Sequence, residues 1–197
     1  KTPLAALKLY LQTLQKHNLT EAKKEQIIDG ALSENERLVQ LIENILNTSR
    51  AENKAFELRK EEIKLLEFLS ILTERYLKRY KDLFLVLTID PNLGLIADPQ
   101  MLETIFSNLI DNAIKYGGAA QQIEIKAVAL DRFVTITVSD EGPGIAAQER
   151  THIFEKFYRI GNEDTRKASG SGLGLYLVAE LVRLHNGQVR CQENQPK

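Results

Sequence analysis

The apolar residues of the first fifty positions recur every three or four residues, a spacing typical of helices that pack along one seam. The first seam contains Leu4, Leu7, Leu11 and Leu14 and ends near His17. A second helix begins at Thr20, whose hydroxyl is a candidate cap, and its seam contains Ile28, Ala31, Asn35, Leu38, Ile42 and Ile45. Two such helices predict an antiparallel hairpin. Pairing two hairpins into a four-helix bundle would bury both apolar stripes, so we expect a homodimer.

Asn35 is the polar member of the second seam. It either fixes the register of the paired helices or is simply a partly solvated neighbour.

A polar stretch at residues 50–54 separates the hairpin from a region with a different period. We place the domain boundary there, which gives a hairpin domain at 1–53 and a second domain at 54–197. The pattern then predicts a strand at 56–58, a helix at 62–80 and a strand at 83–89. Ile63, Leu66, Leu69 and Leu77 are expected to point inward from that helix. Another helix begins at Asp98-Pro99 and ends at Gly117-Gly118, because Asp suits the N-cap, Pro the first turn and Gly the helix end.

Strict alternation of apolar and polar residues at 123–129 and 134–138 predicts an antiparallel strand pair that turns at Asp131-Arg132. A loop-rich stretch follows at 142–171, then a helix at 173–185 and a strand at 188–192. The fold class is therefore α+β: a helical hairpin followed by an α/β sandwich, with helices on one face of a mixed sheet.

Composition narrows the function further. The formal net charge is -1, from 26 Lys+Arg against 27 Asp+Glu, so no overall basic field attracts a nucleic acid. The single cysteine, Cys191, excludes an internal disulfide framework and a cysteine-rich metal site. No apolar run approaches the roughly 18 residues that cross a bilayer, so we expect a soluble chain. Its abrupt start at Lys1 suggests a piece of a longer protein.

Three polar motifs are candidates for chemistry. On the helix that begins at Asp98-Pro99, Asn108, Asn112 and Lys115 lie on one face. Amide oxygens and an ammonium group suit a hydrated Mg²⁺ with its polyphosphate, although a solvated helix face has the same pattern.

The second motif runs from Asp140 to Gly144, where the last alternating strand ends. A carboxylate only accepts hydrogen bonds, so Asp140 is suited to read an amino group such as that of adenine, and the glycines admit a base to the backbone. A plain tight turn has the same composition.

The third motif is the glycine-rich run from Gly170 to Leu175, which leads into a helix. Free N–H groups at a helix start attract phosphate, whereas a flexible hinge is the alternative. The motif does not follow a strand of a βαβ unit, so a dinucleotide-binding Rossmann interpretation fails.

In this order and spacing, the three motifs resemble the N, G1 and G2 boxes of the ATPase fold shared by histidine kinases, DNA gyrase, heat-shock-90 chaperones and MutL. The N box is similar to Asn108 to Tyr116, the G1 box to Asp140 to Gly144, and the G2 box to Gly170 to Leu175. Residues 154–157 resemble the F box of the kinases. Lys1 to Leu4 resemble the end of the H box, in which the phosphate-accepting histidine would precede Lys1. The final strand that the family often has is expected beyond Lys197.

This resemblance implies a sensor histidine kinase of the HisKA type with a GHKL (Bergerat-type) ATPase domain, and it implies ATP and Mg²⁺ as cofactors. It makes Asn112 a Mg²⁺ ligand assisted by Asn108, and places Lys115 and Tyr116 near the phosphates. Asp140 would bind the adenine amino group. The remaining nucleotide contacts that it implies are Gly142, Gly144, Ile145, Phe157, Gly170, Ser171, Gly172, Leu173, Gly174 and Leu175.

The resemblance also makes residues 146–169 a lid over ATP, anchored by the packing of Phe154 and Phe157. Lys156, Arg159, Arg166 and Lys167 are candidates to neutralise the γ-phosphate, Arg159 first among them; plain solvation is the alternative for each. Thr2 stands where the H box places a residue that orients water for dephosphorylating a response regulator, or else it is a first-turn cap. None of His17, His152 and His185 replaces the phosphate acceptor, and His185 is expected to cap a helix end.

The implied partners are a second copy of the chain and a cognate response regulator. The implied location is the cytoplasmic side of a membrane-anchored sensor, with membrane contact only through upstream segments. Two other functions stay open, an ATP-hydrolysing clamp and a nucleotide-binding scaffold. The clamp proteins carry a glutamate where this chain has Asn108, and an amide cannot activate water as a base. A scaffold would be expected to have lost box residues, and here all are present.

Overall fold

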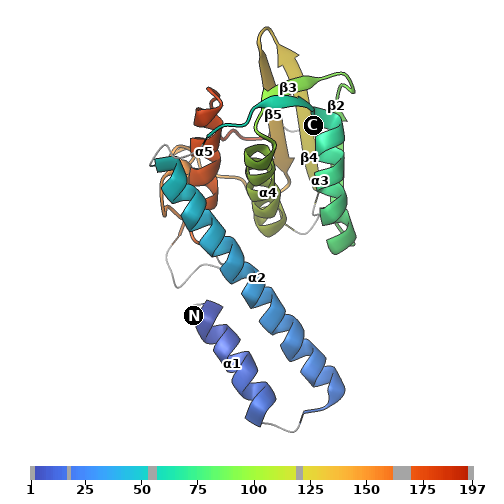
Figure 1. Ribbon diagram of the computed structural model, residues 1–197, viewed down its shortest axis with the longest axis vertical. Helices are drawn as coiled ribbons and strands as arrows, with labels where there is room; N and C mark the ends of the chain where they lie inside the picture. Colours follow the sequence, from blue (N-terminus) through green and yellow to red (C-terminus); the bar gives the residue numbers. More distant parts are fainter. Residues whose placement is uncertain (1–2, 17–18, 53–56, 119–121, 162–169, 195–197) are drawn as a thin grey trace. The chain divides into compact units, whose positions relative to one another are not determined.

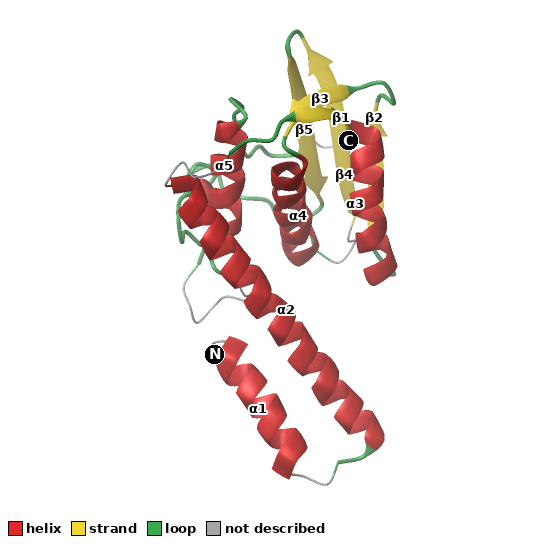
Figure 2. Cartoon of the chain, viewed as in Figure 1, coloured by secondary structure: helices red, strands yellow, loops and turns green. Residues whose placement is uncertain are grey.

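The computed structural model describes residues 3–16, 19–52, 57–118, 122–161 and 170–194. The chain divides into two compact units, Lys1–Arg50 and Ala51–Lys197. Figure 1 shows the helices and strands coloured along the sequence, and Figure 2 colours them by type. No helix in the described parts of the chain combines the length and the apolar character that a bilayer crossing requires.

The first unit is the predicted antiparallel hairpin, formed by α1 (Pro3–Lys16) and α2 (Glu21–Glu52). The two helices approach closely at Gly30, where a Cβ would lie 2.9 Å from the Cζ atom of the Tyr10 ring. This contact explains a glycine inside a long helix, where glycine otherwise costs about 1 kcal/mol relative to alanine. The sequence analysis did not single it out.

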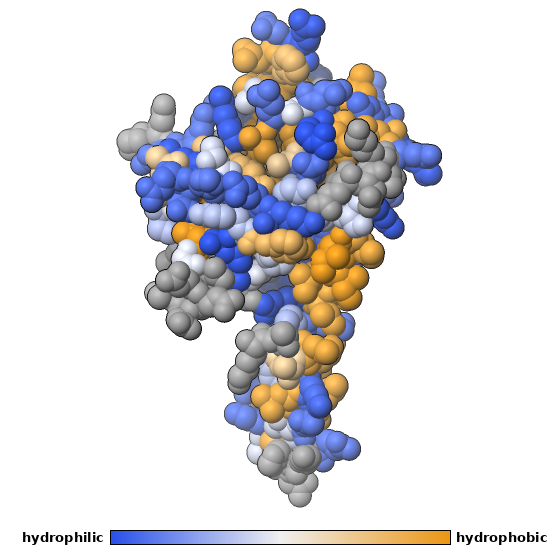
Figure 3. Space-filling view, turned by 90° about the vertical axis from the view of Figure 1, so that its left-hand side faces the viewer, coloured by the Kyte–Doolittle hydropathy of each residue, from blue (hydrophilic) through white to orange (hydrophobic). Residues whose placement is uncertain are grey.

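The seam predicted on α2 separates into two faces. Ala31 is buried within the hairpin together with Ile27, and Leu38 is half-buried. The other members of the predicted seam, Ile28, Asn35, Ile42 and Ile45, are exposed in the single chain. A complete heptad spacing of four and three residues instead runs along this open face through Ile28, Leu32, Asn35, Val39, Ile42 and Leu46. Figure 3 shows apolar surface along the helical part of the molecule.

The second unit contains two sheets. The larger has the strand order β2-β4-β5 and consists of β2 (Phe84–Ile89), β4 (Gln122–Leu130) and β5 (Phe133–Asp140). β2 runs parallel to β4, with Leu87 opposite Ile125, whereas β5 runs antiparallel to β4. The predicted turn is present, and Asp131 takes a φ of 54° in it. The smaller sheet pairs β1 (Glu61–Lys64) with β3 (Gly94–Ala97), with Ile63 opposite Leu95.

Three helices complete this unit: α3 (Leu65–Arg79), α4 (Pro99–Tyr116) and α5 (Gly174–Leu184). α3 and α4 cover one face of the larger sheet, and α5 packs on another side of α4 (Figure 1). The central core joins Phe106 and Ile110 of α4 to Ile123 and Ile125 of β4. A second core joins Met101 and Ile105 of α4 to α5. These two buried faces leave a third face of α4 for its polar residues.

Asp98 caps α4 as predicted, because its Oδ1 accepts hydrogen bonds from the backbone N–H groups of Gln100 and Met101. Its Oδ2 accepts from the N–H of Arg59 at 2.9 Å, and its own N–H donates to Nε2 of His185 at 3.1 Å. Nδ1 of His185 lies 2.8 Å from the carbonyl oxygen of Leu181, so this histidine does cap the end of α5. Asp98 therefore joins the start of α4, the end of α5 and the entry of the chain into this unit.

Several sequence predictions in this unit were wrong. Leu58 is not in a strand, and the strand lies instead at Glu61–Lys64, where Ile63 is the only apolar residue to signal it. The helix consequently begins at Leu65 rather than at 62, and Leu77 is exposed rather than inward. The strand β3 was not predicted, because its four residues after a turn are too few to show an alternation of apolar and polar positions. Residues 188–192 form no strand, since a strand needs a ladder of backbone bonds and these residues have none in the structure.

Candidate functional site

The polar face of α4 is the first part of the site. Asn108 is 8% exposed, and its Nδ2 donates to the carbonyl oxygen of Thr104 at 2.8 Å. Asn112 lies one turn later and is half-buried. Lys115 is exposed, with its Nζ 4.7 Å from the centroid of the Tyr116 ring. The face thus offers amide oxygens and one ammonium group beside an aromatic ring.

The end of β5 meets the end of α4 through glycines. Asp140 is the last residue of β5 and lies opposite Ile123, and its Oδ1 accepts from the N–H of Gly142 at 2.8 Å. A Cβ on Gly142 would lie 2.5 Å from the carbonyl oxygen of Tyr116. A Cβ on Gly117 would lie 3.4 Å from the Cβ of Asp140. Glycine is required at 142 for the Asp140 turn to reach the helix end.

The loop after Asp140 continues through Gly144, which has a φ of +75° that favours glycine. Ile145 follows and is half-buried. Its carbonyl oxygen accepts a hydrogen bond from Nε of Arg150 at 2.8 Å. Arg150 was not among the predicted site residues, because an arginine in a loop carries no pattern that would single it out.

The glycine-rich loop meets α4 at two points. A Cβ on Gly170 would lie 2.7 Å from Nζ of Lys115, and a Cβ on Gly174 would lie 2.6 Å from Oδ1 of Asn108. Between them, Leu173 is 1% exposed and its N–H donates to Oγ of Ser171 at 3.3 Å. α5 begins at Gly174, and the following Leu175 is half-buried. The first turn of α5, where backbone N–H groups have no partner within the helix itself, therefore lies beside the polar face of α4.

The expected lid is anchored differently from the prediction. Phe157 is 64% exposed and is not a packing anchor; the buried residue of this segment is Ile153, within the short helix η1 (His152–Phe154), while Phe154 is half-buried. Phe157 takes a φ of 65°, and its N–H donates to the carbonyl oxygen of Gly172 at 3.0 Å. Gly172 itself has a φ of 71°, and a Cβ there would lie 2.7 Å from the carbonyl carbon of Phe157. Phe157 thus touches the glycine-rich loop through its backbone.

Arg159 is half-buried, near the end of the described part of this loop. Arg166 and Lys167 lie outside the described residues, as does Thr2.

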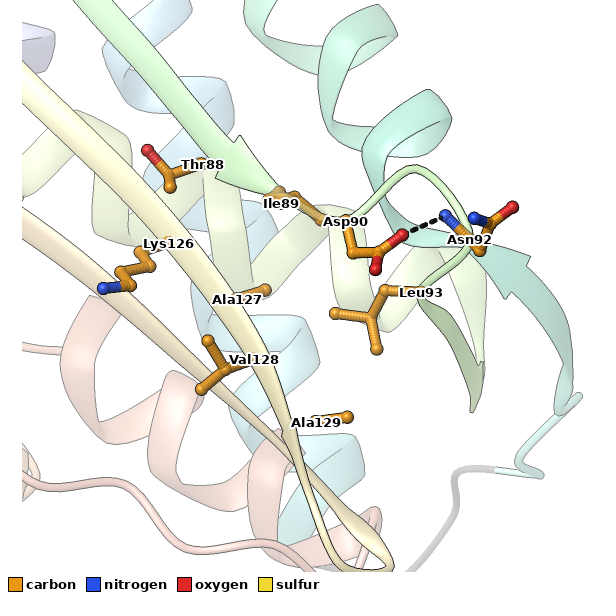
Figure 4. A pocket seen from close by; sticks show the side chains of 9 residues that line it. All are labelled: Thr88, Ile89, Asp90, Asn92, Leu93, Lys126, Ala127, Val128 and Ala129. Atoms are coloured by element: carbon orange, nitrogen blue, oxygen red, sulfur yellow. Dashed lines mark hydrogen bonds between the residues drawn. The ribbon is translucent and has the colours of Figure 1, made fainter.

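An open hollow of about 600 Å³ lies elsewhere, where β4 continues beyond the end of β2 (Figure 4). Its charged lining residues are Asp90 and Lys126, and Oδ1 of Asp90 accepts from the N–H of Asn92 at 2.8 Å. That bond is an ordinary turn interaction. None of the predicted site residues lines this hollow, so it is separate from the site on α4.

Comparisons with known proteins agree with this arrangement. The family model described as "Histidine kinase-, DNA gyrase B-, and HSP90-like ATPase" matches residues 97–197, just over half of the chain. The model described as "His Kinase A (phospho-acceptor) domain" matches residues 1–54. The chain belongs to the sensor histidine kinases. The predicted combination of a HisKA hairpin with a GHKL-type ATPase domain is therefore confirmed, and ATP binding follows from membership of the ATPase family.

Individual histidine kinases show the same relationship. The sensor protein kinase WalK of Staphylococcus epidermidis is 31% identical over 194 residues, which cover 96% of this chain and 32% of WalK. The chain thus spans about a third of the length of such relatives. The structure of full-length ShkA in complex with AMPPNP matches 96% of this chain and 42% of ShkA, with a TM-score of 0.71 and 25% identity. The histidine kinase AdeS of Acinetobacter baumannii shares the fold, with a TM-score of 0.70, 24% identity and coverage of 92% and 84%.

Proposed function

We propose that this chain is the dimerising and ATP-binding core of a sensor histidine kinase, with functional domains at residues 1–53 and 54–197. It binds Mg-ATP between α4, the Asp140 turn and the glycine-rich loop. It then places the γ-phosphoryl group for transfer to a histidine that precedes Lys1 in the longer protein. The observation that carries this proposal is that the Asp140 turn contacts α4 at Tyr116 and the glycine-rich loop contacts the same helix at Asn108.

The base would bind beside Asp140, whose carboxylate accepts a hydrogen bond from the amino group of adenine. One of its oxygens already accepts from Gly142, so the second is the one available to a base. Gly144 leaves room beside the backbone, since a Cβ there would meet no atom within 4 Å, and the half-buried Ile145 supplies an apolar wall.

The phosphates would bind where α5 begins. Backbone N–H groups from Gly170 to Leu175 and the positive end of the helix attract anions, and Lys115 adds an ammonium group beside Gly170. Tyr116 lies next to that ammonium group. The structure of the relative ShkA was determined in complex with AMPPNP, which supports nucleotide binding by this chain.

The residues present fit a magnesium ion that is held mainly by its nucleotide. No cluster of three or more His, Cys, Asp or Glu side chains occurs among the described residues, so a dedicated protein cage is absent there. Asn112 presents a half-buried amide one turn after Asn108, whose Nδ2 is bonded to Thr104 and whose Oδ1 faces Gly174 at the start of α5. Mg²⁺ bound in this way keeps several waters and neutralises charge on the phosphate oxygens.

The chain's contribution to phosphoryl transfer is positioning and charge stabilisation. A nitrogen of the acceptor histidine forms a bond to the γ-phosphorus, the bond from that phosphorus to the bridging oxygen breaks, and ADP leaves. Lys115 and Arg159 would stabilise the negative charge of the transferring group. The phosphoryl group then passes to an aspartate of a response regulator, and Thr2 would orient water in the separate hydrolysis of that phosphoaspartate, which releases inorganic phosphate.

The open face of the hairpin supports a homodimer. Five apolar residues and Asn35 follow one heptad line on α2, and Leu4 and Leu11 are exposed on α1. Pairing two such faces removes them from water and gives a four-helix bundle. We further propose that the chain is a cytoplasmic part of a membrane-anchored sensor; its similarity to a protein named as a sensor protein kinase supports the sensor role.

The competing function is an ATP-hydrolysing clamp on the same fold. It would need a general base near the γ-phosphate, and the buried residue on α4 at that place is the amide Asn108.

A nucleotide titration tests the proposed site. We expect Mg-ATP to bind the chain, Asn112→Ala to remove the dependence of binding on Mg²⁺, and Asp140→Ala to weaken binding of the adenine base. Asn92→Ala, in the turn after β2, is the matched control and should bind ATP normally. Unchanged nucleotide affinity in both site variants would refute the assignment.

A further inference from the structure

We infer that Arg150 is a positioning residue for the base-binding wall of the proposed ATP site. Its guanidinium group connects the carbonyl of Ile145 to Glu193 in the segment that follows α5. This inference rests on the proposed function, because it concerns the same nucleotide site.

The geometry at Arg150 is that of a bridge between two segments. Nε donates to the carbonyl oxygen of Ile145 at 2.8 Å, and Nη2 donates to Oε2 of Glu193 at 3.0 Å. The side chain of Arg150 is 26% exposed, so its bond to Ile145 is partly shielded from solvent, whereas Glu193 is 79% exposed. An arginine is suited to this task because its planar fork donates to two partners at once in a fixed geometry.

The same segment also holds the residue proposed to read the base. Nδ2 of Asn194 donates to the carbonyl oxygen of Asp140 at 2.6 Å. Burial raises the pKa of the Cys191 thiol, while the charge of Arg150 opposes that rise and the charge of Asp140 adds to it. Cys191, Glu193 and Asn194 therefore all lie close to the Asp140 turn.

Through these contacts, residues 191–194 link the segment after α5 to the Asp140 turn by side chains, which backbone pairing in a strand would not do. The wall residue Ile145 lies in a loop between Gly144, which has a positive φ, and a series of turns. Arg150 donates the hydrogen bond to its carbonyl oxygen. Fixing that carbonyl fixes the peptide plane after Ile145, and hence the depth at which a base can lie beside Asp140.

We therefore expect Arg150 to affect the specificity of the site for its base rather than the stability of the fold. If the wall is loosened, the base can shift, and the carboxylate of Asp140 discriminates less sharply between an amino group and an oxygen. Inosine triphosphate is the appropriate probe, because it has an oxygen where ATP has the amino group.

The experiment compares the affinities of the 197-residue chain for ATP and for inosine triphosphate in Arg150→Gln and in the unaltered chain. We expect a loss of roughly tenfold in ATP affinity, the size expected from losing a charge-assisted hydrogen bond, and a smaller preference for ATP. Glu193→Gln should give a weaker loss in the same direction, and Arg150→Lys an intermediate one. Arg183→Gln, which breaks an ion pair with Glu180 on α5, is the matched control and should change neither affinity.

Equal losses for both nucleotides in Arg150→Gln, or no loss at all, would overturn the inference. Lys115→Gln provides the contrast, because the loss of a phosphate contact should weaken the binding of ATP and of inosine triphosphate equally. Thermal unfolding of each variant separates a change in the site from a change in folding. If the unaltered chain bound neither nucleotide, the proposed function would fail instead.

Discussion

Gly174 and Asn108 are packed so closely that a single added methyl group would not fit between them. A Cβ at residue 174 would lie 2.6 Å from Oδ1 of Asn108, a distance that real Cβ atoms essentially never show. Asn108 cannot easily withdraw, because it is buried and its Nδ2 is bonded to Thr104. The start of α5 and the polar face of α4 are therefore held in one arrangement.

Gly174→Ala should displace either the start of α5 or Asn108, and so weaken ATP binding by tenfold or more, as expected when a charged ligand loses its positioned partners. Isothermal titration with ATP measures the effect. Gly94→Ala is a suitable control, because a Cβ at that strand position would lie 3.6 Å from its nearest neighbour in ordinary contact. Normal ATP binding by Gly174→Ala would show that the loop and the helix do not form one site.

Gly172→Ala tests the backbone contact between the lid segment and the glycine-rich loop. The substitution introduces both a strained φ and a clash with the backbone of Phe157. We expect faster proteolysis within 157–172 and weaker ATP binding. Phe157→Ala should have little effect on either, because the contact to Gly172 is made by the backbone and the side chain is 64% exposed. A larger effect from Phe157→Ala would mean that the ring itself matters.

The bond between His185 and Asp98 predicts that His185 contributes more to the stability of the fold than His152 does. The carbonyl of Leu181 only accepts and the N–H of Asp98 only donates, so the ring carries its proton on Nδ1 and none on Nε2. His185→Ala removes the bonds of the ring to Leu181 and to Asp98, and it should lower the free energy of unfolding by about 1–3 kcal/mol. His152→Ala removes an exposed pair with Glu155 and should cost about 0–1 kcal/mol. Chemical denaturation measures both, and equal losses would contradict this account.

The open heptad face of α2 predicts a dimer that one charge can disrupt. Ile42→Asp would place a carboxylate in the buried seam of the bundle and should yield a monomer in analytical ultracentrifugation. Gln40→Asp introduces the same charge at an exposed position off the heptad line and should remain dimeric. A chain that is monomeric before any substitution would refute the proposed assembly.

The sequence predicted best where local signals agree with the final packing. Asp98, Pro99 and Gly117 mark the two ends of α4 by their own chemistry, and the alternation in β4 and β5 reflects burial of one face. The polar triad on α4 was also visible from spacing alone. Once the box residues were considered together, the family resemblance was specific enough to predict the fold class.

The sequence predicted poorly where long-range contacts decide. β1 contains Ile63 as its single apolar residue and exists because β3 pairs with it, so neither strand has a period of its own. Residues 188–192 alternate like a strand but form none, and the next two residues, Glu193 and Asn194, bond to Arg150 and to Asp140 through their side chains. Phe157 was expected to pack by its aromatic ring, whereas its positive φ directs the backbone toward Gly172. The role of Arg150 depends on partners 5 and 43 residues away, which no local pattern reveals.

The most direct test of the central claim is a phosphoryl-transfer assay on this chain together with the residues that precede it in the longer protein. The protein is incubated with Mg-ATP labelled in the γ-phosphate, and the label on the protein is then exposed to acid and to base. We predict protein-bound label that is lost in acid and stable in base, as a phosphohistidine is, and no label in Asn112→Ala. Label found only as free phosphate would contradict the kinase account and favour the ATP-hydrolysing clamp.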